Sequence, residues 1–135
     1  MESLIQDAKQ LIFGYGEKVA QQKLDEMMES LCEDATISMP YTLPLKGKAA
    51  IREFYETNFS KGNYHFKLEF TDEKEVAEMI FINGLMDKNF TSAEKRSNTS
   101  YDFSFILKKE NDVLKIFQMR VVWIPCWATS AYIPK

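Results

Sequence analysis

The sequence predicts an α+β domain in which a bent antiparallel sheet forms a cone around three N-terminal helices. Two observations carry this prediction: apolar residues recur at helical spacing near the N-terminus, and long segments rich in β-branched and aromatic residues follow them. No linker or repeat interrupts the 135 residues, so we expect one domain over residues 1–135. Helices that precede a meander of strands pack on one face of the sheet, and a bent sheet then encloses a cavity.

The three helices are predicted from apolar residues spaced three or four positions apart. On the first helix these residues are Leu4, Ala8, Leu11, Ile12, Tyr15 and Val19. A second, short helix has one apolar face, formed by Leu24, Met27, Met28 and Leu31. The third helix follows Gly47 and ends at residues 61–63, and it turns inward Ile51, Phe54, Tyr55 and Phe59.

The strands are predicted where the period of the apolar residues changes to two. Residues 34–40 (DATISMP) alternate in this way until Pro40, which lacks a backbone N–H and ends the pairing. Residues 64–70 (YHFKLEF) form the clearest strand, with an aromatic face. Three further strands are expected at 75–86, 100–109 and 113–124, with a hairpin loop at 108–112 between the last two.

Composition excludes several classes of partner. The 17 basic and 20 acidic residues give a net charge of -3, and the basic residues form no stripe interleaved with aromatics, so nucleic acid is not expected. The N-terminal residues fit neither a signal peptide nor a membrane span, which predicts a cytoplasmic protein without a membrane partner. Cys32 and Cys126 lack metal-ligand spacing and no phosphate-binding glycine loop occurs, so we expect no metal and no cofactor.

The segment 33–55, EDATISMPYTLPLKGKAAIREFY, closely resembles the bacterial ketosteroid isomerases. The shared pattern is an acidic-Asp-Ala-Thr strand, a proline, a short loop to glycine and a helix; it is densest over 24–59 and runs collinearly from 11 to 123. These isomerases and the SnoaL-like polyketide cyclases belong to the nuclear transport factor 2-like superfamily. The resemblance therefore implies the nuclear transport factor 2-like, or cystatin-like, fold.

The resemblance also implies candidate site residues. In the isomerases, an Asp before the proline moves a proton, while a Tyr of the first helix and a protonated Asp of a later strand hold the oxyanion. Met39 stands at the base position here, and a thioether cannot take a proton at neutral pH, so that mechanism cannot operate from this position. The resemblance places Tyr15 and Asp102 as the catalytic pair, with Tyr55 supporting Tyr15. A slip of one residue would instead turn Asp102 outward.

Substrate-binding positions are expected at Met39, Phe54, Tyr55, Ile37 and Trp123. Tyr15, Tyr55 and Met39 are also typical of an ordinary hydrophobic core. The lone His65 lies on the polar face of its strand and is expected at the surface. The apolar tail that begins at Trp123 is expected to cover either the cavity mouth, the sheet or a second subunit, and the sequence does not choose among these.

Two functions remain open at this point. The first is binding of a small apolar molecule, with or without a carbonyl group, or a cofactor-free isomerase, cyclase or dehydratase reaction on it. The second is a non-enzymatic dimerisation or interaction module with a filled cavity. A homodimer is expected in either case, because Ile80, Ile82, Phe103, Phe105 and their sequence neighbours cannot all face the cavity, which leaves apolar residues on the outer sheet face.

Overall fold

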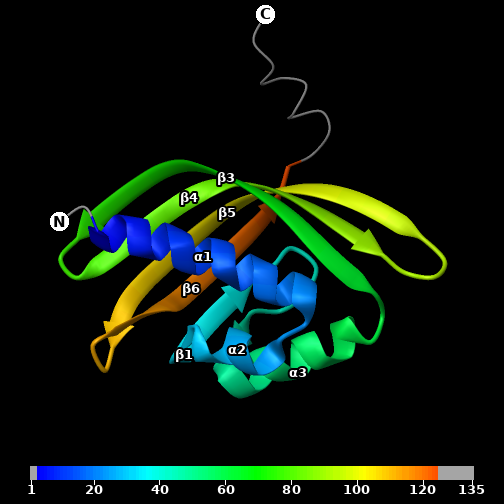
Figure 1. Ribbon diagram of the computed structural model, residues 1–135, viewed down its shortest axis with the longest axis horizontal. Helices are drawn as coiled ribbons and strands as arrows, with labels where there is room; N and C mark the ends of the chain where they lie inside the picture. Colours follow the sequence, from blue (N-terminus) through cyan, green and yellow to red (C-terminus); the bar gives the residue numbers. More distant parts are fainter. Residues whose placement is uncertain (1–2, 125–135) are drawn as a thin grey trace, which may run out of the picture.

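The computed structural model describes residues 3–124, which form a six-stranded sheet with three helices on one face (Figure 1). The helices are α1 (Ser3–Gln21), α2 (Leu24–Glu29) and α3 (Lys48–Phe59). The strands are β1 (Leu31–Ser38), β2 (Leu45–Lys46), β3 (Asn63–Val76), β4 (Met79–Thr91), β5 (Arg96–Glu110) and β6 (Val113–Trp123). The predicted α+β class is therefore confirmed. Among these residues, no helix has the length and apolar character needed to cross a membrane.

The sheet has the order β2-β1-β6-β5-β4-β3 and remains open. Four of its neighbouring pairs are antiparallel, as predicted, but β1 and β6 are parallel, so the sheet is mixed. Pairs joined by a tight hairpin must run antiparallel. β1 and β6 are separated by most of the chain, so no hairpin fixes their direction and the sequence pattern did not reveal it.

Two tight turns set the lengths of the long strands. The predicted start of the strand at 75–86 was wrong. β3 extends to Val76, a turn at Ala77 follows, and β4 begins at Met79. Residues 71–78 are all exposed, so no alternation marked this turn in the sequence. The predicted hairpin between β5 and β6 is confirmed, but its loop is shorter than 108–112, because residues 108–110 still belong to β5. The loop consists of Asn111 and Asp112, which have φ of 55° and 66°.

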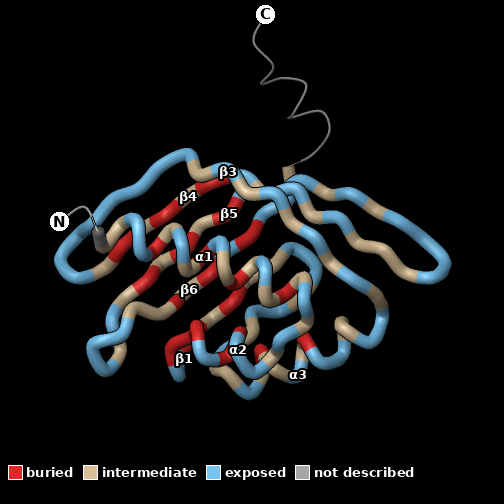
Figure 2. Tube along the Cα trace, in the orientation of Figure 1, coloured by how far each residue is buried: buried red, intermediate tan, exposed pale blue. Residues whose placement is uncertain are grey.

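The core lies between the inner face of the sheet and the helices. α1 packs against β3 and α3 against β1, and buried residues follow the middle of the strands (Figure 2). Ile80, Ile82, Phe103 and Phe105 all face inward, whereas their neighbours, such as Phe81 and Ile106, face outward and are half-buried. This register fixes which side chains reach the pocket described below.

Two features position the helices around the core. Gly47 precedes α3 with φ of 88°, a backbone conformation that favours glycine. Gln22, at the end of α1, donates from Nε2 to the carbonyl oxygens of Phe59 and Gly62 at 3.3 and 3.0 Å. These two hydrogen bonds connect the end of α1 to the segment between α3 and β3. Residues of both α1 and α3 line the pocket.

Candidate ligand-binding pocket

A pocket of about 80 Å³ opens between α1, α3 and the inner face of the sheet. Its walls come from α1, α3, the loop after β1 and strands β3 to β6, and most of the lining side chains are aliphatic, methionine or aromatic. Its volume exceeds the ~15 Å³ that one water needs, yet falls below the ~300 Å³ of a pocket for drug-sized ligands. The pocket therefore suits a molecule with about one ring.

Tyr15 and Tyr55 place two hydroxyl groups in this apolar pocket. The Tyr15 hydroxyl donates to Tyr55 Oη at 3.1 Å, and the two residues are only 4% and 7% exposed. Burial raises the pKa of Tyr55 to about 12, and burial together with the neighbouring Tyr55 raises the pKa of Tyr15 well above its usual value. Both phenols thus stay neutral at physiological pH. One donates to the other, which leaves one hydroxyl proton for a ligand.

The raised pKa values predict that stability falls in strong alkali. The folded protein retains phenolic protons that the unfolded chain loses near pH 10, so this stability is complete below pH 10 and is lost as the pH rises toward about 12. Urea unfolding between pH 9 and 11.5 measures the decline. The double variant Tyr15→Phe, Tyr55→Phe should show a smaller decline, and the part that remains comes from Tyr41 and Tyr64, whose pKa values burial also raises. Absorbance at 295 nm showing all six tyrosines titrating near pH 10 in the folded protein would contradict the prediction.

Met39 and Phe54 line the pocket together with Tyr15 and Tyr55, so the structure brings these four predicted site residues together. Met39 follows the last residue of β1 directly, just before the exposed Pro40. Among residues 3–124, neither a carboxylate nor a histidine lines the pocket. The usual side chains for a general base are therefore missing from its described walls.

The structure does not bring Asp102 to this site. Asp102 is exposed on the outer face of β5, opposite Leu85 of β4 and Val122 of β6. Its neighbours Tyr101 and Phe103 point into the pocket instead, because adjacent residues of a strand face opposite sides of the sheet. The predicted pocket position of Asp102 is therefore corrected: the one-residue slip in register has occurred.

Two further predicted residues lie beside the pocket rather than in its wall. Ile37 is fully buried in the core under α3 and is absent from the lining. Trp123 is 51% exposed and lies opposite Tyr101 in the ladder, with its ring centroid 6.1 Å from that of Tyr41. Trp123 thus stands at the rim of the pocket. The rest of the tail, from residue 125, lies outside the described residues, as does Cys126.

Lys88 is a pocket residue that the sequence reasoning missed. Its Nζ lies 5.2 Å from the ring centroids of Tyr41 and Tyr101 and 5.5 Å from that of Tyr64, and it donates to Tyr41 Oη at 3.2 Å. The signal was present in the alternation of β4, where Lys88 shares the inward side with Met86 and Phe90. A lysine on the apolar side of a strand indicates a special environment.

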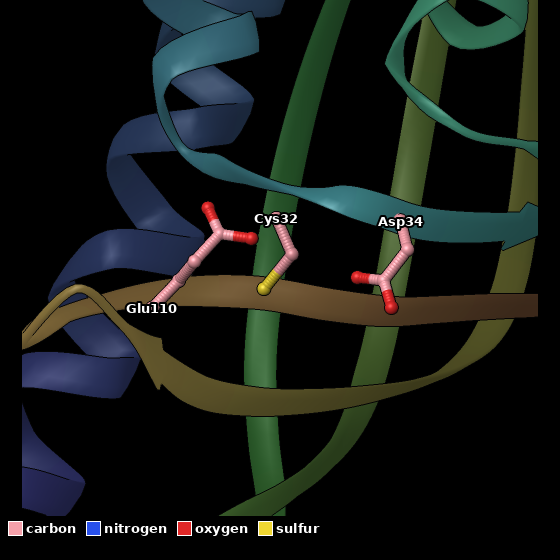
Figure 3. A group of neighbouring side chains, drawn as sticks. All are labelled: Cys32, Asp34 and Glu110. Carbon is pink, nitrogen blue, oxygen red and sulfur yellow. The ribbon is translucent and has the colours of Figure 1, made fainter.

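A second group of polar side chains lies away from the pocket, near the start of β1 (Figure 3). Potential ligand atoms of Cys32, Asp34 and Glu110 lie within 4.8 Å of one another. Glu110 is already engaged, since one of its oxygens accepts a hydrogen bond from the Glu33 N–H at 3.0 Å and the other faces Lys115 at 3.7 Å. Burial raises the pKa of the Cys32 thiol, which opposes the thiolate that a metal needs. We interpret the group as a structural contact between β1 and the β5–β6 hairpin.

Comparison with known proteins finds similarity in structure but not in sequence. No family model and no curated protein matches the chain. A scytalone dehydratase-like protein from Novosphingobium aromaticivorans superposes with a TM-score of 0.83 at 10% identity, over 91% of this chain and 85% of that chain. A ketosteroid isomerase-like protein from Erwinia carotovora atroseptica gives 0.77 at 14% identity, over 87% and 93%.

A third similar structure is described by its fold. It is an NTF2-like protein with a cystatin-like fold from Novosphingobium aromaticivorans, with a TM-score of 0.77 at 12% identity, over 98% of this chain and 92% of that chain. Identities this low show the fold alone. The chain therefore has the nuclear transport factor 2-like, cystatin-like fold that the resemblance implied, while its function must be argued from its own pocket.

Proposed function

We propose that this protein binds a small, largely apolar molecule with a carbonyl group in the pocket between α1, α3 and the sheet. The observation that carries the proposal is the Tyr15–Tyr55 pair, a neutral and almost fully buried hydrogen-bond donor in the wall of a largely apolar pocket. A carbonyl oxygen of the ligand would accept a hydrogen bond from the free hydroxyl group. Both the hydroxyl and the carbonyl would then be hydrogen-bonded although neither contacts water. The pocket volume limits the buried part of the ligand to about one ring.

Binding accounts for this site better than proton transfer does. The same tyrosine pair would stabilise an oxyanion, as an isomerase, cyclase or dehydratase reaction requires. Such a reaction also needs a base, and Met39 occupies the position where the resembling isomerases hold theirs. We therefore propose ligand binding as the function and keep cofactor-free catalysis as the second candidate, favoured by the buried oxyanion-type donor.

Titration with 4-methylacetophenone, followed by amide chemical shifts in NMR spectra, tests the proposal. At about 0.5 kcal/mol per non-hydrogen atom, this ketone should bind with a Kd of roughly 0.2 mM. The double variant Tyr15→Phe, Tyr55→Phe should weaken binding about fivefold to tenfold, by removing one hydrogen bond. The matched control is 4-ethyltoluene, which lacks the oxygen and should bind both proteins equally. If the pocket resonances do not shift with either molecule, the filled-cavity alternative is favoured.

The unmodified chain should show no appreciable 5-to-4 steroid isomerase activity. Met39 cannot accept the proton, and a steroid exceeds the volume of the pocket. Ultraviolet absorbance of the conjugated product measures the reaction, with Met39→Leu as a matched control and Met39→Asp as the variant that restores a carboxylate. Robust turnover by the unmodified chain would mean that another residue serves as the base.

We also propose that a second copy of the chain covers the outer face of the sheet. Among the described residues no helix lies on this face, and Leu85 and Val122 are exposed there beside the half-buried Phe81 and Ile106. Light scattering at micromolar concentration should give a mass near twice 15.7 kDa. Val122→Arg should shift it toward one chain, whereas Leu43→Arg, in the exposed loop before β2, should not. A single-chain mass at every concentration would exclude the dimer.

A further inference from the structure

We infer that the pocket selects ligands that carry a carboxylate, which pairs with Lys88 inside a ring formed by Tyr41, Tyr64 and Tyr101. The inference rests on the proposed ligand-binding function and adds a chemical class to it: among small, largely apolar molecules, those that carry a carboxylate. Three observations support it: the position of Lys88, the absence of a counter-ion among the described residues, and the different depths at which Lys88 and the Tyr15–Tyr55 pair lie in the pocket.

Within the part of the chain that the structure describes, Lys88 carries a charge into the pocket without an acidic partner. Its neighbours across the ladder are Phe66 of β3 and Thr99 of β5, and no ion pair with Lys88 occurs within residues 3–124. The adjacent acid, Asp87, faces outward and accepts a hydrogen bond from Ser100 Oγ at 2.7 Å. A half-buried cation without a carboxylate is unfavourable, and tyrosine ring faces offset only part of that cost. An incoming anion would complete the site.

The lysine is held in its charged form. Burial lowers the pKa of Lys88, but the hydroxyl groups of Tyr101 and Tyr41 stabilise the ammonium, and the net pKa lies above the usual value. An ammonium group pairs with an oxyanion, whereas a nucleophilic or basic lysine would need the neutral amine. The chemistry of this environment therefore favours recognition of a carboxylate over Schiff-base formation with a carbonyl.

The pocket carries polar groups at two depths, the Tyr15–Tyr55 hydroxyl pair and Lys88. Tyr15 and Tyr55 are almost fully buried, whereas Tyr41, beside Lys88, is 49% exposed. The Lys88 end is therefore nearer to solvent and the hydroxyl pair lies deeper. Aliphatic and methionine side chains line the space around both, among them Ile12, Val19, Met86 and Met119. A ligand that fits this arrangement has an apolar ring within the pocket, a carboxylate directed toward the mouth and a hydrogen-bond acceptor, such as a carbonyl oxygen, directed toward the hydroxyl pair.

A matched series of small aromatic compounds tests the inference on the full chain. The compounds are 4-methylbenzoate, its neutral isostere 4-methylbenzamide and the ketone 4-methylacetophenone, each titrated at pH 7 and followed by NMR. The unmodified protein should bind the benzoate about tenfold more tightly than the benzamide, because hydrogen bonds to charged groups are the stronger ones. The preference should weaken as salt is raised, since the site is only half-buried.

Three variants separate the role of Lys88 from a general effect on the pocket. Lys88→Met keeps the side-chain length, removes the charge and should bring the benzoate-to-benzamide ratio to about one. Lys88→Arg keeps the charge and should retain a preference for the acid. Lys67→Met removes an exposed lysine on the outer face of β3 and should leave the ratio unchanged. Circular dichroism melting curves establish that each variant is folded.

The outcomes distinguish failure of the inference from failure of the proposed function. If the ketone and the amide bind but the acid binds no more tightly, the carboxylate inference is overturned and apolar ligand binding survives. If the acid preference persists in Lys88→Met or disappears in Lys67→Met, Lys88 is not the recognition group and the inference is likewise overturned. If none of the three compounds shifts the pocket resonances, the proposed function fails, and the carboxylate inference fails with it.

Discussion

Phe103→Ala is expected to lower the free energy of unfolding by about 3 to 5 kcal/mol, the usual cost of truncating a buried aromatic residue. Phe103 is 1% exposed, and its ring meets those of Phe70 and Phe105 edge to face, with centroids 6.1 and 5.4 Å away. Urea unfolding measures the change. The control is Phe13→Ala, on the half-exposed side of α1, where a change within about 0.5 kcal/mol is expected.

The same substitution should alter ligand selection, because Phe103 also lines the pocket. Removing its ring would enlarge the cavity, so a bulkier ketone such as 4-tert-butylacetophenone should gain affinity relative to 4-methylacetophenone. A loss of stability below about 1 kcal/mol would mean that the neighbouring side chains collapse into the space. A large loss without any change in ketone preference would instead show that the vacated volume is not connected to the pocket.

Gly84→Ala is expected to lower the free energy of unfolding by about 3 kcal/mol, the upper end of the usual cost of overpacking a core. A Cβ atom at this position would lie 2.5 Å from the nearest Phe103 ring atom and too close to the Glu69 carbonyl oxygen. The ring has little room to shift in the core, and the carbonyl belongs to the neighbouring strand, so the methyl group overpacks the β3–β4–β5 layer. Urea denaturation again provides the measurement.

Gly14→Ala is the matched control for Gly84→Ala. Gly14 lies within α1, and an added Cβ there would meet no atom within 4 Å, so this substitution should stabilise the protein by about 0.5 to 1 kcal/mol. The two glycine variants should therefore change stability in opposite directions. Equal effects would mean that backbone entropy, and not the close approach of Gly84 to β3 and Phe103, determines the outcome.

The parts of the fold that could be predicted are those whose apolar period is regular. α1 and α3 present an apolar face every three or four residues, and the first half of β3 alternates strictly, so their existence followed from the sequence. The second half of β3 is charged and exposed, and its pairing with β4 comes from backbone bonds that leave no such pattern. The same lack of alternation explains why the sequence did not predict the turn at Ala77.

The pocket was predictable only in part, because register decides which face a strand residue occupies. Met39, Phe54 and Tyr55 line the pocket and fall within residues 24–59, where the resemblance is densest, and Tyr15 of α1 lines it as well. Asp102 was misplaced because the resemblance is weak around β5, and a shift of one residue reverses every side chain there. Lys88 was visible in the alternation of β4, yet its role depends on three tyrosines that only the folded chain brings together.

The parallel pairing of β1 with β6 also constrains how the chain acquires its structure during synthesis. β3, β4, β5 and β6 follow one another through hairpins, so each can pair with its predecessor as soon as it leaves the ribosome. β1 is made much earlier, yet its partner in the ladder is the last strand of the sheet. The pocket wall that carries Met39 therefore closes only after translation has passed residue 120, and until then the apolar side of β1 relies on the helices for cover.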